Sequence, residues 1–223
     1  MSLAAEYNIE HYPSAAEKLA DWWVHAVGLI GAAVGGAVLL VLAIASGRAG
    51  MVTATGLYAL TLVGMLSCSA AYNLTRPSAA RPFLRRLDEA GIFMMIAGCY
   101  TPFTTQRFTG GWAIGMTALV WSLALSGVAA KLLVRKLPDR LWTAFYVGFG
   151  WLAVIAIHPM VSDVPTGALV LLVIGGLLYT SGTLVFHNHR LPYRRAIWHG
   201  FVVTGAAIHY AAIFTGVVLA AHA

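Results

Sequence analysis

The stretch LPYRRAIWHGF, residues 191–201, places Arg195 and His199 four residues apart at the start of the last apolar segment. In a helix, two residues at this spacing lie on one face, one turn apart. Histidine binds metals and transfers protons, whereas the arginine side chain only donates hydrogen bonds. The pair therefore fits three interpretations: a metal site, a metal site that has lost a ligand, or a salt bridge to a carboxylate elsewhere in the fold.

Polar side chains at helical spacing also stand near the ends of other apolar segments. Asp21 and His25 are four residues apart, with Glu17 one turn earlier, and Ser69 and Asn73 repeat the spacing. Ionisable groups in or beside membrane spans are costly to place, so each is a functional hypothesis by default. We expect one polar pocket on the cytoplasmic side, built from Glu17, Asp21, His25, Ser69, Asn73, Asp88, Glu89, Arg195 and His199.

Apolar runs long enough to cross a bilayer must position these residues. The 223-residue chain is 60% hydrophobic and 10% charged, against roughly a quarter charged in a soluble domain. A span needs about 20 mostly apolar residues. Seven candidates occur, at about 22–46, 51–73, 88–106, 111–134, 141–160, 165–187 and 196–219. The third is the weakest, because its apolar core is short, and it crosses only if it begins near Asp88 and continues past Pro102. We predict an all-α integral membrane protein, a seven-transmembrane-helix bundle forming one domain over 1–223.

The placement of Lys and Arg predicts the orientation of this bundle. Of the 14 such residues, all but Arg48 and Arg107 lie near the N-terminus or in the connections after the second, fourth and sixth spans. The positive-inside rule then puts the N-terminus in the cytoplasm and the C-terminus outside. Residues 1–21 form an amphipathic cytoplasmic segment, in which Ser14 and Glu17 have capping-box spacing.

The net charge of +6 is explained by this topology and by contact with anionic lipid head groups. We therefore expect membrane lipids as partners, no nucleic acid, and a location in the cell inner (plasma) membrane. Outside the polar pocket, His209 is expected to be a hydrogen-bonded core histidine, and Cys68 and Cys99 to be small buried apolar residues.

The sequence also resembles a known family through six motifs: EKLADWWVHAVG, SAAYN, LDEAGIFMMIAGCYTPF, WSLALSG, GWLAVIAI and RLPYRRAIWHGFVVTGAAIHY. They are similar to the hemolysin III branch of the progestin and adipoQ receptor (PAQR) superfamily, from Glu17 to about Tyr210. The resemblance implies a seven-helix bundle with a cytoplasmic N-terminus. It also implies a zinc ion near the cytoplasmic face, held by one histidine ending the second helix and two opening the seventh, with a serine and an aspartate nearby. The wider superfamily is compared with lipid-amide hydrolases such as alkaline ceramidases.

This sequence keeps only part of the implied zinc site. Ser69, Asp88 and His199 match the serine, the aspartate and the last histidine, whereas Asn73 and Arg195 stand where two zinc histidines are implied. A catalytic zinc usually has three protein ligands, arginine offers no lone pair, and an asparagine amide is a weak zinc ligand. We therefore expect a degenerate zinc site without a bound cofactor. The alternative is a rescued zinc site whose ligands are His199, Asp88 and either Glu89 or His25.

In a metal-free site, Arg195 would supply the positive charge that the metal supplies elsewhere. We expect Glu89 or Asp88 to be its partner, since a guanidinium binds a carboxylate bidentately, and Asn73 can bridge by donating to a carboxylate. The cluster would serve either as a pocket for a lipid head group or as a salt bridge that fixes the second, third and seventh helices.

Three functions are compatible with these residues. The first is a PAQR-like multi-pass membrane protein that affects membrane lipid, fluidity or energy homeostasis through the polar pocket and binds a lipid-like ligand. The second is a metal-dependent, ceramidase-like lipid amidohydrolase, in which Ser69 and Asp88 would be catalytic and His199 a metal ligand. The third is a pore, cytolysin or transporter, although the spans lack a ladder of charges through the membrane.

Overall fold

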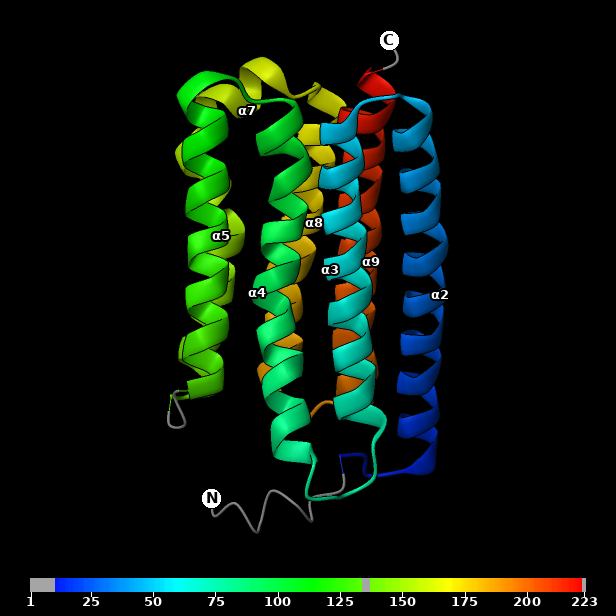
Figure 1. Ribbon diagram of the computed structural model, residues 1–223. Coiled ribbons are helices and arrows are strands. Elements are labelled where there is room, and N and C mark those ends of the chain that lie inside the picture. Colours follow the sequence, from blue (N-terminus) through cyan, green and yellow to red (C-terminus); the bar gives the residue numbers. More distant parts are fainter. Residues whose placement is uncertain (1–10, 134–136, 222–223) are drawn as a thin grey trace.

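Seven membrane-length helical segments follow one another in the computed structural model, which describes residues 11–133 and 137–221 (Figure 1). The described elements are α2 (Ala15–Ala45), α3 (Ala49–Leu74), α4 (Arg81–Gln106), α5 (Gly110–Leu133), α6 (Asp139–Gly150), η1 (Trp151–Ala156), α7 (Ile157–Asp163), α8 (Thr166–His187), α9 (Arg194–Ile213), η2 (Phe214–Val218) and η3 (Leu219–Ala221). No strand occurs within these residues. The protein is an all-α integral membrane bundle, as predicted.

The first and last spans lie side by side although they are far apart in the sequence. Helix α2 packs against both α3 and α9, and further contacts join α3 to α4, α4 to α5, and α8 to α9. A glycine makes the approach of α2 to α9 close, because a Cβ atom added at Gly28 would lie 2.7 Å from Val203. This packing brings the beginning of α2 against the beginning of α9.

Helix α2 begins as the sequence predicts. The Ser14 side chain accepts a hydrogen bond from the backbone N–H of Glu17 at 3.2 Å, which satisfies one of the unpaired donors at the start of the helix. Residues 15–21 of the predicted N-terminal segment therefore belong to the first span, and residues 1–10 lie outside the described residues.

The third span differs from its prediction at its start. Helix α4 begins at Arg81 and not near Asp88, with Pro82 in its first turn, where the missing N–H of proline costs no hydrogen bond. It continues past Pro102 to Gln106, as a crossing requires. Six of the seven described segments are long and apolar enough to span by composition. Helix α4 is the seventh and has 26 residues, but its first turns are rich in charged side chains.

The fifth span is not one continuous α-helix, as the range 141–160 suggested, but α6, the 3₁₀ segment η1 and α7. The side chain of Tyr100 on α4 explains the break. Its hydroxyl donates to the carbonyl of Gly150 at 2.8 Å and accepts from the N–H of Ala153 at 2.8 Å. A side chain inserted into the backbone ladder is a recognised cause of such an interruption.

The two ends of the bundle differ in charge. We call the end that holds the first turns of α2, α4 and α9 the basic end; it carries Lys18, Arg81, Arg85 and Arg194. It lies at the bottom of Figure 1, and the last described turn of the chain lies at the opposite end, as seven crossings require.

Candidate functional site

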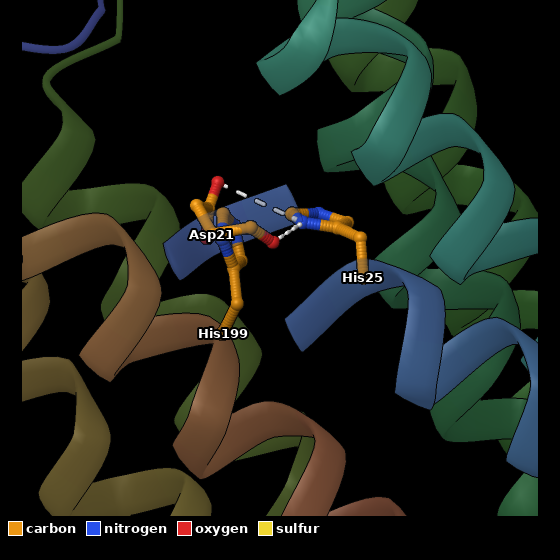
Figure 2. Close-up of side chains that lie close together, drawn as sticks. All are labelled: Asp21, His25 and His199. Carbon is orange, nitrogen blue, oxygen red and sulfur yellow. Dashed lines mark hydrogen bonds and ion pairs between the residues drawn. The ribbon is translucent and has the colours of Figure 1, made fainter. Parts of the chain in front are cut away.

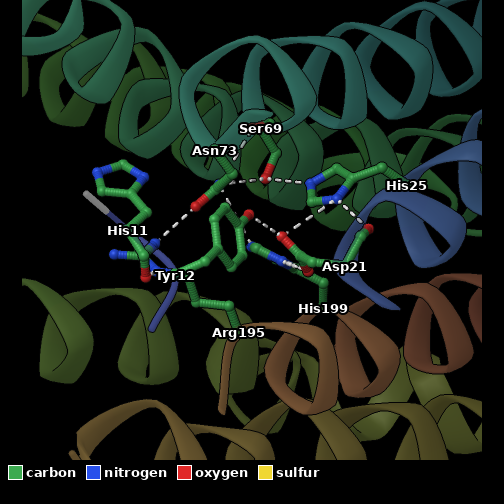
Figure 3. A network of polar contacts seen from close by, with 8 residues as sticks. All are labelled: His11, Tyr12, Asp21, His25, Ser69, Asn73, Arg195 and His199. Carbon is green, nitrogen blue, oxygen red and sulfur yellow. Dashed lines mark hydrogen bonds and ion pairs between the residues drawn. The ribbon is translucent and has the colours of Figure 1, made fainter. Parts of the chain in front are cut away.

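A network of polar side chains from three helices fills the basic end of the bundle (Figure 3). Its members are Asp21 and His25 on α2, Ser69 and Asn73 on α3, Arg195 and His199 on α9, and His11 and Tyr12 before α2. Six of these eight were expected in one pocket, and the structure brings those six together. Glu17 does not join them: among the described residues its side chain makes no hydrogen bond or ion pair with a member of this network, and its backbone N–H donates to Ser14 at the start of α2.

At the centre of the network, three side chains form a cluster that could hold a metal ion: Asp21, His25 and His199 (Figure 2). All three are buried, and their ligand atoms lie within 4.8 Å of one another. Nδ1 of His199 is 2.6 Å from Oδ1 of Asp21. Nδ1 of His25 is 2.9 Å from the backbone oxygen of Asp21, which leaves Nε2 of His25 toward Ser69, at 3.3 Å from its hydroxyl oxygen.

Asn73 connects this triad to Arg195. Its Oδ1 accepts a hydrogen bond from Nη1 of Arg195 at 2.6 Å, so its amide nitrogen faces the other way. That nitrogen lies 3.0 Å from the backbone oxygen of Ser69 and 3.4 Å from Nε2 of His199. Because an amide nitrogen only donates, Nε2 of His199 must accept, and the proton of the neutral ring is on Nδ1, facing Asp21. Arg195 therefore determines, through Asn73, which nitrogen of His199 is protonated.

Two residues that precede α2 complete the network, and the sequence did not reveal them. The hydroxyl of the buried Tyr12 donates to Oδ2 of Asp21, and the Arg195 guanidinium lies 5.9 Å from its ring centroid. Burial and the neighbouring Asp21 raise the pKa of Tyr12 above its usual range, so the phenol keeps its proton. The only signal for this role was an aromatic residue shortly before a helix cap.

His11 lies beside the same arginine. Its backbone oxygen accepts from Nε of Arg195 at 3.2 Å, and its ring packs edge-on against Tyr72. Burial and the charge of Arg195 lower the pKa of His11 to about 3, so its imidazole is neutral at physiological pH. Residues 11 and 12 thus close the network on the side away from the membrane interior.

The expected pairing of Arg195 with Glu89 or Asp88 is wrong. Glu89 forms ion pairs with Arg85 at 2.8 Å and with Lys131 on α5, and Arg85 also binds Asp139 on α6 at 2.8 Å. Among the described residues, no ion pair joins Arg195 to a carboxylate, and its partners are the neutral oxygens of Asn73 and His11. Glu89 therefore fixes α4, α5 and α6 to one another and stands apart from the triad.

The donor set of the triad suits zinc, which accepts imidazole nitrogen and carboxylate oxygen. It differs from the rescued site considered for the sequence: His199 and His25 belong to it, but the carboxylate is Asp21 and not Asp88 or Glu89. The spacing of Asp21 and His25 on one helical face was the signal that pointed to them. Each of the three ligands also has a hydrogen-bond donor beside it, from Tyr12, Ser69 or Asn73, so the triad is satisfied without a metal.

A cavity of about 1270 Å³ extends from this network into the bundle. At the basic end it is lined by Ser69, Asn73, Asp88, Arg195 and His199. Deeper, its walls are apolar side chains of α4, α7, α8 and α9, among them Met95, Phe103, Ile157, Leu172 and Val202. The two residues assigned catalytic roles on the enzymatic interpretation, Ser69 and Asp88, both face this space. Asp21 and His25 do not line the cavity, so His199 is the member of the triad that faces it.

Three further residues with a sequence-based expectation, His209, Cys68 and Cys99, can also be placed. His209 is hydrogen-bonded as predicted, with Nε2 at 3.2 Å from the backbone oxygen of Leu172. Cys68 and Cys99 are free and partly buried.

Comparison with known proteins supports the resemblance drawn from the motifs. The family described as "Haemolysin-III related" matches residues 15–210. The Hemolysin-3 homolog of Bacillus subtilis (strain 168) is 29% identical over 86% of this chain and 90% of its own length. Hemolysin-3 of Bacillus cereus is 30% identical over 87% and 89%, respectively. The human monocyte to macrophage differentiation factor is 28% identical over 96% and 90%.

Proposed function

Because this chain belongs to the haemolysin III family of multi-pass membrane proteins, we propose that it contributes to membrane lipid homeostasis by binding a lipid in its cavity. The head group of the lipid would lie at the basic end, which the positive-inside rule assigns to the cytoplasm. Its acyl chain would lie in the apolar interior. The observation that carries this proposal is the change in the cavity lining, from charged and polar side chains to apolar ones, within a single continuous space.

The polar end of the cavity is chemically suited to a head group. Arg195 holds a charge with no carboxylate partner among the described residues, and its guanidinium has donors beyond the two bonds it makes to neutral oxygens. Ser69 and Asn73 add groups that donate or accept, and Asp88 adds an acceptor. Together these side chains could bind a phosphate, carboxylate or hydroxyl of a lipid.

The apolar end supports the same proposal, because it can hold an acyl chain away from water. A bulky side chain placed in this apolar part of the cavity should exclude the acyl chain of the lipid. We expect Leu172→Trp, which changes a residue of the cavity wall, to weaken binding of a fluorescent acyl lipid about tenfold or more, or at least about 1.4 kcal/mol. The matched control is Leu177→Trp, on the same helix, where the side chain is 55% exposed on the outer surface.

The measurement is titration of the fluorescent lipid into the purified full-length protein in nanodiscs, with the thermal stability of both variants checked in parallel. Equal affinity of the wild type and the folded Leu172→Trp variant would refute lipid binding in this cavity.

A second candidate function, metal-dependent hydrolysis of a lipid amide, is favoured by one observation, the triad of Asp21, His25 and His199. A zinc ion held there would act as a Lewis acid and lower the pKa of a bound water. Ser69 and Asp88 face the cavity where a lipid carbonyl would lie. The test is release of fatty acid from a fluorescent ceramide. Hydrolysis that persists unchanged in Asp21→Ala and His25→Ala would exclude the triad as the metal centre.

A further inference from the structure

Two residues that line the deep part of the cavity each have a buried polar atom without a hydrogen-bond partner among the described residues: the hydroxyl of Tyr179 on α8 and Nδ1 of His209 on α9. Both side chains line the cavity, and their ring centroids are 5.4 Å apart. Native proteins rarely leave buried polar atoms unpaired, because the lost hydrogen bond to water is not replaced. Two such atoms, on neighbouring rings that line one cavity, indicate that something else binds there.

The position of His209 determines what its free nitrogen can bind. Nε2 lies 3.2 Å from the backbone oxygen of Leu172, and a carbonyl oxygen only accepts, so Nε2 carries the hydrogen. In the neutral ring, Nδ1 is then an acceptor. The hydroxyl of Tyr179 can donate. The pair presents one acceptor and one donor, which is the complement of a hydroxyl group. An ester or ketone oxygen cannot donate to Nδ1 of His209 and would leave it unpaired.

Both rings are held in place by the facing helix. A Cβ atom added at Gly175 on α8 would lie 2.3 Å from the His209 ring, and one added at Gly205 on α9 would lie 3.0 Å from the Tyr179 ring. Each ring therefore occupies space that a larger residue would fill. The two polar atoms belong to side chains packed against backbone, so their positions are set by the fold before any ligand arrives.

We propose that Tyr179 and His209 form a subsite for a hydroxyl group carried on the chain of the lipid in the cavity. The ligand hydroxyl donates to Nδ1 of His209 and accepts from the hydroxyl of Tyr179. This inference rests on the proposed function and narrows it, since it names a hydroxylated acyl chain as the preferred ligand class.

The depth of the subsite places this hydroxyl far from the head group. His209 follows His199 by ten residues on α9, so it lies about 15 Å deeper at a rise of about 1.5 Å per residue. That is about half the thickness of a hydrocarbon core of about 30 Å. A lipid whose head group binds at the polar end of the cavity, beside His199, thus reaches the subsite with the middle or far part of its chain.

Ricinoleate and oleate test the proposal, because they share chain length and double bond and differ in one hydroxyl along the chain. Each would be used to displace a fluorescent acyl probe from the full-length protein in nanodiscs. One hydrogen-bonded group lost or gained corresponds to about a three- to tenfold change in affinity, so ricinoleate should bind about three- to tenfold more tightly. In Tyr179→Phe, which keeps the ring, the ratio of the two affinities should fall toward one.

The matched control is Tyr58→Phe. The hydroxyl of Tyr58 is also buried and has no hydrogen-bond partner in the described part of the chain, but this residue does not line the cavity. The preference for ricinoleate should persist in that variant, and His209→Phe gives a second test if Tyr179→Phe does not fold. Equal affinity for the two acids in the wild type would overturn the hydroxyl subsite, and the two polar atoms would then bind water. Lipid binding in the cavity would be unaffected by that result. Failure of both acids to displace the probe would instead overturn the proposed function and this inference with it.

Discussion

Arg195 terminates a hydrogen-bonded chain that runs through Asn73 and His199 to Asp21. Arg195→Ala leaves Oδ1 of Asn73 without its charged donor, so the amide can turn and release His199. Hydrogen bonds to charged groups contribute about 1.5–3 kcal/mol, and we expect a destabilisation of that order, measured as thermal unfolding in detergent. Arg190→Ala, on the exposed connection before α9, is the control and should change little.

Glu89 pairs with Arg85 and Lys131 and not with Arg195, which leads to a second prediction about Arg195. Because Glu89 and Arg195 are not partners, Glu89→Gln should destabilise the wild type and the Arg195→Ala variant by the same amount. A double-mutant cycle that shows strong coupling between Glu89 and Arg195 would contradict the structure and support a salt bridge between them.

The amount of metal bound by the protein should depend on the triad of Asp21, His25 and His199. Its three ligands already have hydrogen-bond donors from Tyr12, Ser69 and Asn73, so a metal must displace those contacts. We expect less than one zinc per chain after purification without added metal, and up to one on titration with zinc. Asp21→Ala should abolish that uptake, because a two-histidine set lacks the third protein ligand of a typical site.

The positions of Asn73 and Arg195 give a direct gain-of-function test. Replacing both by histidine removes the nearby guanidinium and adds two imidazoles beside His199. The double variant should bind zinc more tightly than the wild type in elemental analysis and calorimetry. Unchanged zinc content would show that these positions do not face a common metal position in this fold.

At the scale of elements, the break in the fifth span depends on one hydroxyl. Tyr100→Phe removes the acceptor of the Ala153 N–H and the donor to the Gly150 carbonyl. An unpaired buried backbone group costs about 1–3 kcal/mol, so the thermal stability should fall and hydrogen exchange should rise within residues 150–156. Tyr210→Phe, which removes a hydroxyl with no bond recorded among the described residues, should not affect that segment.

The sequence predicted those elements whose cause is local. Six spans follow from apolar composition, and the Ser14 cap follows from its own side chain. The start of α4 was missed because charged residues such as Arg85 and Arg86 hide a helix from a hydropathy argument. The η1 segment could not be predicted, because Tyr100 lies about fifty residues away in the chain.

The same distinction holds for the site. Helical spacing put Asp21 with His25 and Arg195 with His199 correctly, since each pair lies on one helix. It pointed to Glu89 or Asp88 as the partner of Arg195, where the structure has Asn73, because that choice depends on how α3, α4 and α9 are rotated against one another.

For the whole molecule, the charge distribution predicts a cytoplasmic basic end. A single cysteine placed at Ala223, in a variant lacking Cys68 and Cys99, should react with a membrane-impermeant maleimide in intact cells. The same label at Ser14, near the basic end, should react only after lysis. The reverse labelling pattern would show that the bundle has the opposite orientation, with the polar end of the cavity outside the cell.

The contact between Asp21 and His199 also constrains how the protein is made. The two residues are 178 positions apart, so at about 5–20 residues per second the ribosome needs about 10–35 s to supply His199 after Asp21. During that interval α2 is already made, and its buried aspartate has no imidazole from α9. Nascent chains that end after α8 should therefore keep Asp21 reachable by water, and they should be better substrates for membrane proteases than the finished protein.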